Sequence, residues 1–367
     1  MYNKDMEFSI FTVVLVLNLL LGYKIPFQAE PTNIQVELIE SQPISESQKI
    51  LYTGTVRHIF FHSLIIYPKL AFSDSGFSAG YKDWMITRDE FQKILSELYK
   101  NDFILIDIKS LYSTDSDGLL IKKELYLPKG KKPLILSVDD LSYYPSLVGH
   151  GFADKLVLDI DGNVATEVVV ENGKREITRD GDVVPILDDF VSSHPDFSLD
   201  GAKGIIATTG YHGILGYRTN NIKSIDYIKE VESAKKVVSR LESTGWRFAN
   251  HSYSHSNAYL TGDITLEKVK MEAELWNKEV KPLVGETDIF IGPFGQIFTQ
   301  NDPRREYLES VGFKVFCGVG MDKYLRYFPD ALVMNRADID GYRLLNSPHY
   351  LKEYFDVEKV IDPIRSL

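Results

Sequence analysis

Strand-like and helix-like segments alternate along most of this chain, and that alternation limits the folds available to it. Continuous apolar runs such as FILIDI (103–108), PLILSV (133–138) and GIIATTG (204–210) are typical of strands buried in a parallel sheet. Amphipathic segments such as TRDEFQKILSELYKND and TLEKVKMEAELWNKEV separate such runs and have helical periodicity. The pattern predicts an α/β fold, either a parallel barrel or a doubly wound sheet.

One segment interrupts the alternation. Residues 150–182 contain short alternating stretches broken by Asp-Gly and Asn-Gly pairs, which is typical of a β-hairpin or a meander. We therefore expect a single domain over residues 55–367 with an insertion at about 150–182, after the strand that ends in Asp-Asp.

The first 54 residues differ from the rest. The run FSIFTVVLVLNLLLG (8–22) has no charge, but its 15 residues are fewer than the roughly 20 that span a bilayer. Residues 1–29 are predicted to be a signal peptide or membrane anchor, with a buried core helix as the alternative, and residues 30–54 a polar linker. Either leader would place the domain outside the cytoplasm, secreted or membrane-anchored.

Charge and cysteine content exclude several classes of partner and site. The formal net charge of -11 argues against nucleic acid or an anionic membrane surface as the main partner, because both favour clustered Lys and Arg. A single cysteine, Cys317, excludes an intrachain disulfide and a zinc site built from cysteines. Cys317 lies in an apolar stretch and is expected to be a buried hydrophobic residue. The chain is expected to be a monomer.

Two histidines four residues apart, His251 and His255, follow the predicted strand RFAN. If the chain turns into a helix there, both imidazoles lie on one face and can share a metal ion. His58 and His62 have the same spacing on a predicted strand, where four residues span about 13 Å, so they are not expected to chelate.

A third metal ligand is expected from one of two Asp-Asp pairs. Asp188-Asp189 lies inside a predicted helix and is expected to face solvent. Asp139-Asp140 ends an apolar strand, where one carboxylate can bind a metal while its neighbour faces the water on that metal. A helix N-cap is the alternative role for this second pair.

Three motifs in order, LSVDD, ANHSYSH and PFG, resemble those of the NodB-like polysaccharide deacetylases, carbohydrate esterase family 4. The resemblance extends from about Arg57 to the C-terminus. It implies a distorted (β/α)7 barrel and a hydrolase that acts on carbon-nitrogen bonds, removing acetyl groups from N-acetylated sugars. The implied substrate is peptidoglycan or a secreted poly-N-acetylhexosamine.

The resemblance also implies roles for individual residues. Asp139 would be the general base, and a divalent cation, most commonly zinc, would have three ligands: Asp140, His251 and His255. The tetrahedral oxyanion would lie near the backbone N–H of Phe294. His349 is the candidate proton donor to the leaving amine, and His62 the alternative, with substrate binding at the barrel mouth as its other possible role.

The third motif departs from the family pattern, because Ile291 stands where an Arg commonly steadies the base. We hypothesise that Arg336 supplies this guanidinium from another loop. Two other functions remain as alternatives: a non-catalytic glycan-binding protein on a decayed deacetylase barrel, and an iron oxygenase with a two-His-one-carboxylate site. The second is disfavoured because such sites favour a β-sandwich pattern that is absent from the sequence.

Overall fold

The structure is a computed structural model that describes residues 49–73, 76–170, 173–320, 322 and 325–366. The predicted leader and most of the predicted linker lie outside the described residues. The last linker residues are part of the folded unit, because β1 (Lys49–Leu51) pairs antiparallel with β6 (Tyr126–Pro128). Within these described ranges, no helix is long and apolar enough to span a membrane.

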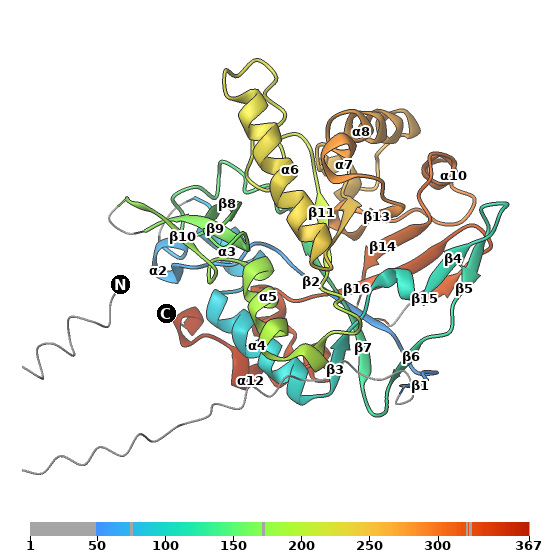
Figure 1. The fold of residues 1–367 in the computed structure, drawn as a ribbon, viewed down its shortest axis with the longest axis horizontal. Coiled ribbons are helices and arrows are strands. Elements are labelled where there is room, and N and C mark those ends of the chain that lie inside the picture. The colour runs from blue at the N-terminus through green and yellow to red at the C-terminus, as the bar shows by residue number, and fades with distance from the viewer. Residues whose placement is uncertain (1–48, 74–75, 171–172, 321, 323–324, 367) are drawn as a thin grey trace, which may run out of the picture. The chain divides into compact units, whose positions relative to one another are not determined.

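Seven parallel strands close into a barrel within the described residues (Figure 1). They occur in the spatial order β2, β7, β11, β12, β13, β14, β16 and back to β2. Their bounds are β2 (Arg57–Phe61), β7 (Lys132–Asp139), β11 (Ile205–Thr208), β12 (Arg247–Asn250), β13 (Ile289–Ile291), β14 (Val315–Val319) and β16 (Leu332–Asp338). The predicted α/β fold is confirmed as a parallel barrel, and the doubly wound alternative is wrong.

The segment FILIDI, predicted as a buried strand, is shorter than expected and lies outside the ring. Only β3 (Phe103–Leu105) is a strand, and it pairs with the first residues of β7. The last residues of β7 pair with β11 on that same side. One edge of the eight-residue strand β7 therefore pairs first with β3 and then with β11. Asp107 ends the extended chain by capping a short 3-10 helix, Ile108–Ser110, through a hydrogen bond from the backbone N–H of Lys109.

Strand β16 was not predicted, and it carries Arg336, which was expected to lie in a loop. Its first residues, LVM, are buried and apolar, but the polar residues Asn335 and Arg336 follow directly and obscure the strand pattern. The strand pairs parallel with both β14 and β2 and so closes the barrel.

Helices follow most of the strands, as the alternation predicted. The longer ones are α4 (Arg88–Lys100), α5 (Val183–Ser193), α6 (Tyr227–Ser243), α8 (Leu266–Glu279) and α10 (Pro303–Ser310). Figure 1 shows α4 and α5 on one side of the strands and α8 and α10 on another. Shorter helices are α2 (Pro68–Ala71), α3 (Ser78–Trp84), α7 (Asn257–Leu260), α9 (Lys281–Val284), α11 (Gly341–Asn346) and α12 (Val357–Val360).

Side chains alternate between the inside and the outside of the barrel. In β7, Ile135 belongs to a buried cluster to which each of β11, β12, β13, β14 and β16 also contributes, and this cluster fills the interior. Leu134 and Leu136, on the opposite face, pack in the cluster between the strands and α4, α5 and α6. Strand residues with odd numbers in β7, including Asp139, therefore point inward.

The interruption after β7 is a three-stranded antiparallel sheet, the meander alternative of the prediction. Its strands are β8 (Ala153–Leu158), β9 (Val164–Val169) and β10 (Arg175–Thr178). Three short strands remain: β4 (Tyr112–Thr114) pairs with β5 (Leu120–Lys122), and β15 (Leu325–Tyr327) pairs antiparallel with β16.

Candidate metal centre

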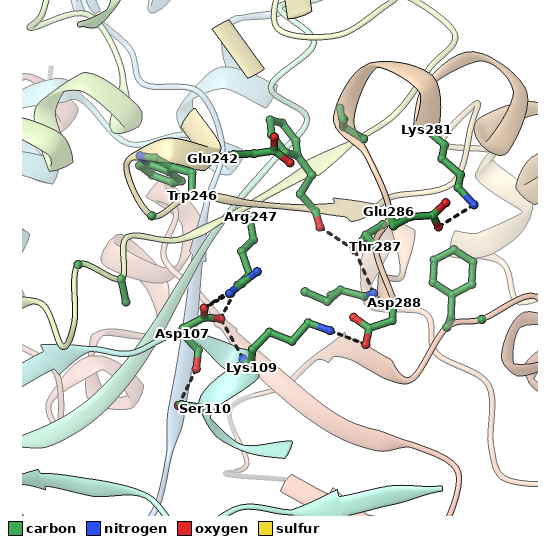
Figure 2. Close-up of a pocket in the computed structure, with 18 of the residues that line it drawn as sticks. Asp107, Lys109, Ser110, Glu242, Trp246, Arg247, Lys281, Glu286, Thr287 and Asp288 are labelled. Atoms are coloured by element: carbon green, nitrogen blue, oxygen red, sulfur yellow. Dashed lines mark hydrogen bonds and ion pairs between the residues drawn. The ribbon is translucent and has the colours of Figure 1, made fainter. Parts of the chain in front are cut away.

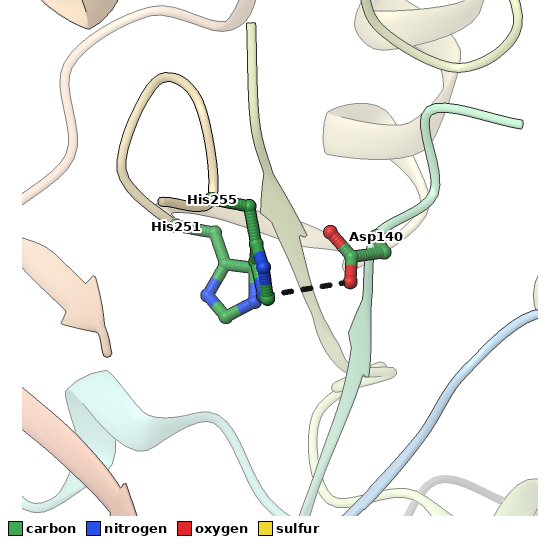
Figure 3. Close-up of side chains that lie close together, drawn as sticks. All are labelled: Asp140, His251 and His255. Atoms are coloured by element: carbon green, nitrogen blue, oxygen red, sulfur yellow. Dashed lines mark ion pairs between the residues drawn. The ribbon is translucent and has the colours of Figure 1, made fainter. Parts of the chain in front are cut away.

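Asp140, His251 and His255 lie together at the carboxyl ends of the barrel strands (Figure 3). Asp140 directly follows β7 and His251 directly follows β12. One potential ligand atom from each residue lies within 4.8 Å of the other two. This is the end of a parallel barrel at which catalytic residues converge, and the group could hold a metal ion.

The two histidines are brought together by a loop rather than by a helix, the condition considered in the sequence analysis. Helix α7 begins only at Asn257. The Asn250 side chain accepts a hydrogen bond from the Ser252 backbone N–H at 2.8 Å, and the Ser252 hydroxyl accepts one from the His255 N–H at 3.1 Å. These side chains replace helical backbone hydrogen bonds, and Ser252 and His255 take φ angles of 54° and 48°.

Glu272 in α8 fixes this loop from behind and was not found by sequence reasoning. Its carboxylate is only 1% exposed and accepts hydrogen bonds from the backbone N–H groups of Tyr253 and Ser254 at 3.0 and 2.6 Å. The Ser254 hydroxyl donates a further one at 2.6 Å. The available signal was an acidic residue on the apolar face of a helix, between Val269 and Trp276.

His251 is prepared to bind a metal through Nε2. Its Nδ1 lies 2.7 Å from the carbonyl oxygen of Ile291, and a carbonyl only accepts, so Nδ1 carries the proton. The lone pair is therefore on Nε2. Burial lowers the pKa of His251, although Asp139 and Asp140 act in the other direction, and this favours the neutral imidazole that metals require.

Asp140 has an unusual backbone conformation, with a φ of 59°. Its Oδ2 lies 3.7 Å from Nε2 of His255, the contact marked in Figure 3. Its Oδ1 accepts a hydrogen bond of 2.5 Å from the Tyr144 hydroxyl, another contact that the sequence did not reveal. Left-handed φ values at both Asp140 and His255 are typical of functional sites, where surrounding contacts hold a strained backbone.

Asp139 lies beside these ligands, with its Oδ2 3.9 Å from Nε2 of His251. Arg336 donates two hydrogen bonds to the Asp139 carboxylate, at 2.7 and 2.9 Å, and is 0% exposed. The guanidinium carbon of Arg336 lies over the Phe60 ring, 4.1 Å from its centroid. Burial alone would raise the pKa of Asp139, but Arg336 and His251 together hold it well below its usual value. Arg336 thus contacts Asp139 from inside the barrel, and its burial does not suit direct substrate binding.

His58 and His62, which were not expected to chelate a metal, have different surroundings. His58 is 2% exposed, and its Nε2 lies 3.0 Å from the Ser137 hydroxyl. His62 follows β2 at the mouth and is half-buried. Its charge would lower the pKa of both Asp139 and Asp140, so it is within electrostatic reach of the centre.

Phe294 also lies beside the centre. Its ring meets that of His255 edge to face, with 4.4 Å between the centroids, and it is 43% exposed. It belongs to a one-turn 3-10 helix, Pro293–Gly295, with a φ of 54°. The turn requires glycine at 292, because a Cβ there would lie 1.9 Å from the carbonyl oxygen of Gln296.

His349, the first candidate for the proton donor, lies on the surface. It belongs to a short 3-10 helix, Pro348–Leu351, and its side chain is exposed. Its ring packs against Tyr350 with 4.1 Å between centroids.

Cys317 is fully buried as expected, and burial raises the pKa of its thiol to about 12.

A pocket of about 820 Å³ lies at the other end of the barrel (Figure 2). Arg247, the first residue of β12, and Asp288, which precedes β13, line it. Two ion pairs lie in it: Arg247 donates to Asp107 at 2.6 Å and Lys109 to Asp288 at 2.5 Å. The metal-ligand group lies at the opposite end, so this pocket is not part of the candidate centre.

Comparison with protein-family models, with curated proteins and with solved structures found no match for this chain. The similarity of its three motifs to the NodB-like deacetylases therefore remains an expectation.

Proposed function

We propose that this chain is a metal-dependent hydrolase that removes acetyl groups from N-acetylated sugars of a cell-envelope or extracellular polysaccharide. The observation that carries the proposal is the juxtaposition of three potential metal ligands with a buried carboxylate, Asp139, at the mouth of a parallel barrel. Three protein ligands leave a coordination position for water or substrate, which distinguishes catalytic from structural zinc sites.

The donor set fits a divalent cation such as zinc. Two imidazoles and one carboxylate form a mixed nitrogen and oxygen set of the kind found in hydrolytic zinc sites. The hydrogen bond from His251 to Ile291 supports this fit, because it directs a lone pair to the centre. A divalent cation bound there would supply Lewis-acid chemistry, polarising an acyl carbonyl and acidifying water.

Asp139 is the proposed general base. Arg336 holds its carboxylate in the ionised form, which is the form that accepts a proton from the attacking water. The two hydrogen bonds from Arg336 also fix the orientation of the carboxylate relative to His251. These contacts support the hypothesis that Arg336 steadies the base in place of the Arg that is absent at position 291.

His62 is now the preferred proton donor to the leaving amine. The charge of His62 acts on the carboxylates of Asp139 and Asp140. It also acts on Asp340, a buried carboxyl at the start of α11. His349 is exposed on the surface and packs against Tyr350. A proton donor must come within hydrogen-bond reach of the leaving group, which favours His62 over His349.

The substrate class rests on the motif resemblance, with two supporting observations. The exposed ring of Phe294 beside His255 offers an apolar surface against which a sugar ring can pack. The net charge of -11 disfavours a polyanionic substrate and is compatible with a neutral N-acetylated glycan or its cationic deacetylated product.

The proposal is tested by acetate release from chitooligosaccharides with the full chain, before and after removal of metal. We expect release that requires a divalent cation and is lost in Asp139→Asn. Oligosaccharide binding with no release of acetate at any metal loading would overturn the proposal in favour of a non-catalytic glycan-binding protein.

A further inference from the structure

Three hydroxyl groups form a hydrogen-bonded chain that ends on the metal-ligand candidate Asp140. The Tyr144 hydroxyl is 2.5 Å from Oδ1 of Asp140 and 3.0 Å from the Thr209 hydroxyl. The Thr209 hydroxyl is in turn 3.0 Å from that of Ser142. Ser142 and Thr209 are both 0% exposed, so water does not compete for these groups.

The direction of every hydrogen bond in this chain is fixed by its end. A carboxylate only accepts, so Tyr144 must donate its single hydroxyl proton to Asp140. The Tyr144 oxygen then accepts a hydrogen bond from the Thr209 hydroxyl. The Thr209 oxygen in turn accepts one from the Ser142 hydroxyl. Donors aligned in one direction polarise each other, which strengthens the terminal hydrogen bond to Asp140.

The two oxygens of Asp140 consequently have different surroundings. Oδ1 is engaged by Tyr144, whereas Oδ2 is the oxygen that lies 3.7 Å from Nε2 of His255. A short hydrogen bond from a phenol lowers the basicity of Oδ1 and holds the carboxylate in one rotational state. Only Oδ2 is then directed towards the two histidines.

We infer that Tyr144 is a positioning residue that restricts Asp140 to a single metal–oxygen bond and so keeps the coordination number of the bound cation low. The inference rests on the proposed function, because it assumes that Asp140 is a metal ligand. Nothing in the motif resemblance assigns a role to Tyr144. Its consequence is a preference for tetrahedral zinc over cations that require more oxygen ligands.

The test uses the full chain, stripped of metal and titrated with Zn²⁺ or Co²⁺ alone. In Tyr144→Phe, Asp140 is free to bind through both oxygens. We expect the affinity for Zn²⁺ to fall about 10–100-fold, as is typical for loss of an outer-shell partner. We also expect weaker visible absorption per bound Co²⁺, because tetrahedral Co²⁺ absorbs more strongly than Co²⁺ with five or six ligands.

Two further variants keep the result interpretable. Thr209→Val removes the donor to Tyr144 at nearly constant volume, and it should shift the affinity and the Co²⁺ spectrum in the same direction by a smaller amount. Tyr143→Phe is the matched control: the Tyr143 hydroxyl donates to Asp182 at 2.7 Å rather than to Asp140, so both readouts should equal those of the wild type.

An unchanged Zn²⁺ affinity and Co²⁺ spectrum in Tyr144→Phe would overturn the inference while leaving the proposed function intact. An equal loss in Tyr143→Phe would also overturn it, because the effect would then be a general loosening of the loop. Failure of the wild-type chain to bind one Zn²⁺ or Co²⁺ would instead remove the proposed function, and with it this inference.

Discussion

The guanidinium of Arg336 and the carboxylate of Asp139 form a two-point ion pair inside the barrel, 197 residues apart in sequence. Arg336 also donates to the Ser137 hydroxyl at 3.1 Å, and Ser137 contacts His58. Asp139 is therefore supported from the barrel interior while its other side faces His251. This arrangement explains how a fully buried carboxylate remains ionised beside the candidate metal centre.

Loss of Arg336 is expected to be strongly destabilising. In Arg336→Met the Asp139 carboxylate stays buried without a partner, which typically costs about 3–5 kcal/mol. Urea unfolding at neutral pH measures this change. Arg343→Met is the matched control, because Arg343 pairs with Asp338 where both side chains are partly exposed, and its loss should cost less than that of Arg336.

A double variant separates the ion pair from simple packing. Adding Asp139→Asn to Arg336→Met removes the unpaired charge, so part of the lost stability should return. Additive destabilisation by the two substitutions would contradict the account of a coupled pair.

Substitutions of the neighbouring residues Asp139 and Asp140 are expected to have different effects on activity and on zinc binding. Asp139→Asn should lower acetate release about 10²–10⁴-fold, the usual contribution of a general base, while leaving zinc binding intact. Asp140→Asn should weaken zinc binding first, because it removes the charge of a ligand. Isothermal titration with Zn²⁺ and an acetate assay on both variants distinguish these roles, and parallel loss of both properties in Asp139→Asn would refute the assignment of a base.

His62 is predicted to donate a proton to the leaving amine, which gives a test based on the leaving group. His62→Ala should impair hydrolysis of an N-acetylated sugar far more than hydrolysis of an activated acetate ester, whose leaving group needs no proton. His349→Ala should leave both rates unchanged. The opposite result, with amide hydrolysis lost in His349→Ala and retained in His62→Ala, would restore the first assignment.

Asp182 should make stability depend on pH. It is 0% exposed and caps α5, and it also accepts hydrogen bonds from the backbone N–H of Leu64 at 3.0 Å and from the Tyr143 hydroxyl at 2.7 Å. Burial raises its pKa from 3.8 to about 6, although these hydrogen bonds act in the other direction. The folded state therefore binds this proton more tightly than the unfolded state.

The sign follows from that difference. The stabilisation from the protonated carboxyl is complete below pH 4 and is lost as the pH rises through 6. It amounts to about 3 kcal/mol at most, from about 1.4 kcal/mol per unit. The free energy of unfolding of the wild type, measured relative to Asp182→Asn, should fall between pH 4 and pH 6, and a constant difference would contradict the prediction.

The features that depend on the local sequence pattern could be predicted from the sequence. Strand and helix periodicity predicted the α/β class, and the positions of Asp139-Asp140 and His251 at the ends of predicted strands led to the prediction that they contribute to one metal centre. The closed ring itself was not distinguishable from an open sheet, because both consist of the same alternating segments.

The supporting residues were not predictable in the same way. Arg336 and Glu272 contact residues distant in sequence, and the contact of Tyr144 with Asp140, four residues away, depends on the conformation of the loop between them. Arg336 contacts Asp139 through β16, whose mixed composition hid the strand. Glu272 binds the histidine loop from a helix, and Tyr144 contacts Asp140 in the loop after β7, where Asp140 and Tyr143 have left-handed φ angles. Periodicity records which face of an element is buried, not which side chain meets it there.

The central claim is that Asp140, His251 and His255 bind one divalent cation. Anomalous diffraction from crystals of the full chain soaked in zinc tests it most directly. The account predicts one strong peak at the barrel mouth, about 2.0–2.2 Å from the histidine Nε2 atoms and an Asp140 oxygen. Zinc bound only elsewhere, at saturating concentration and with these three side chains out of bonding range, would contradict it.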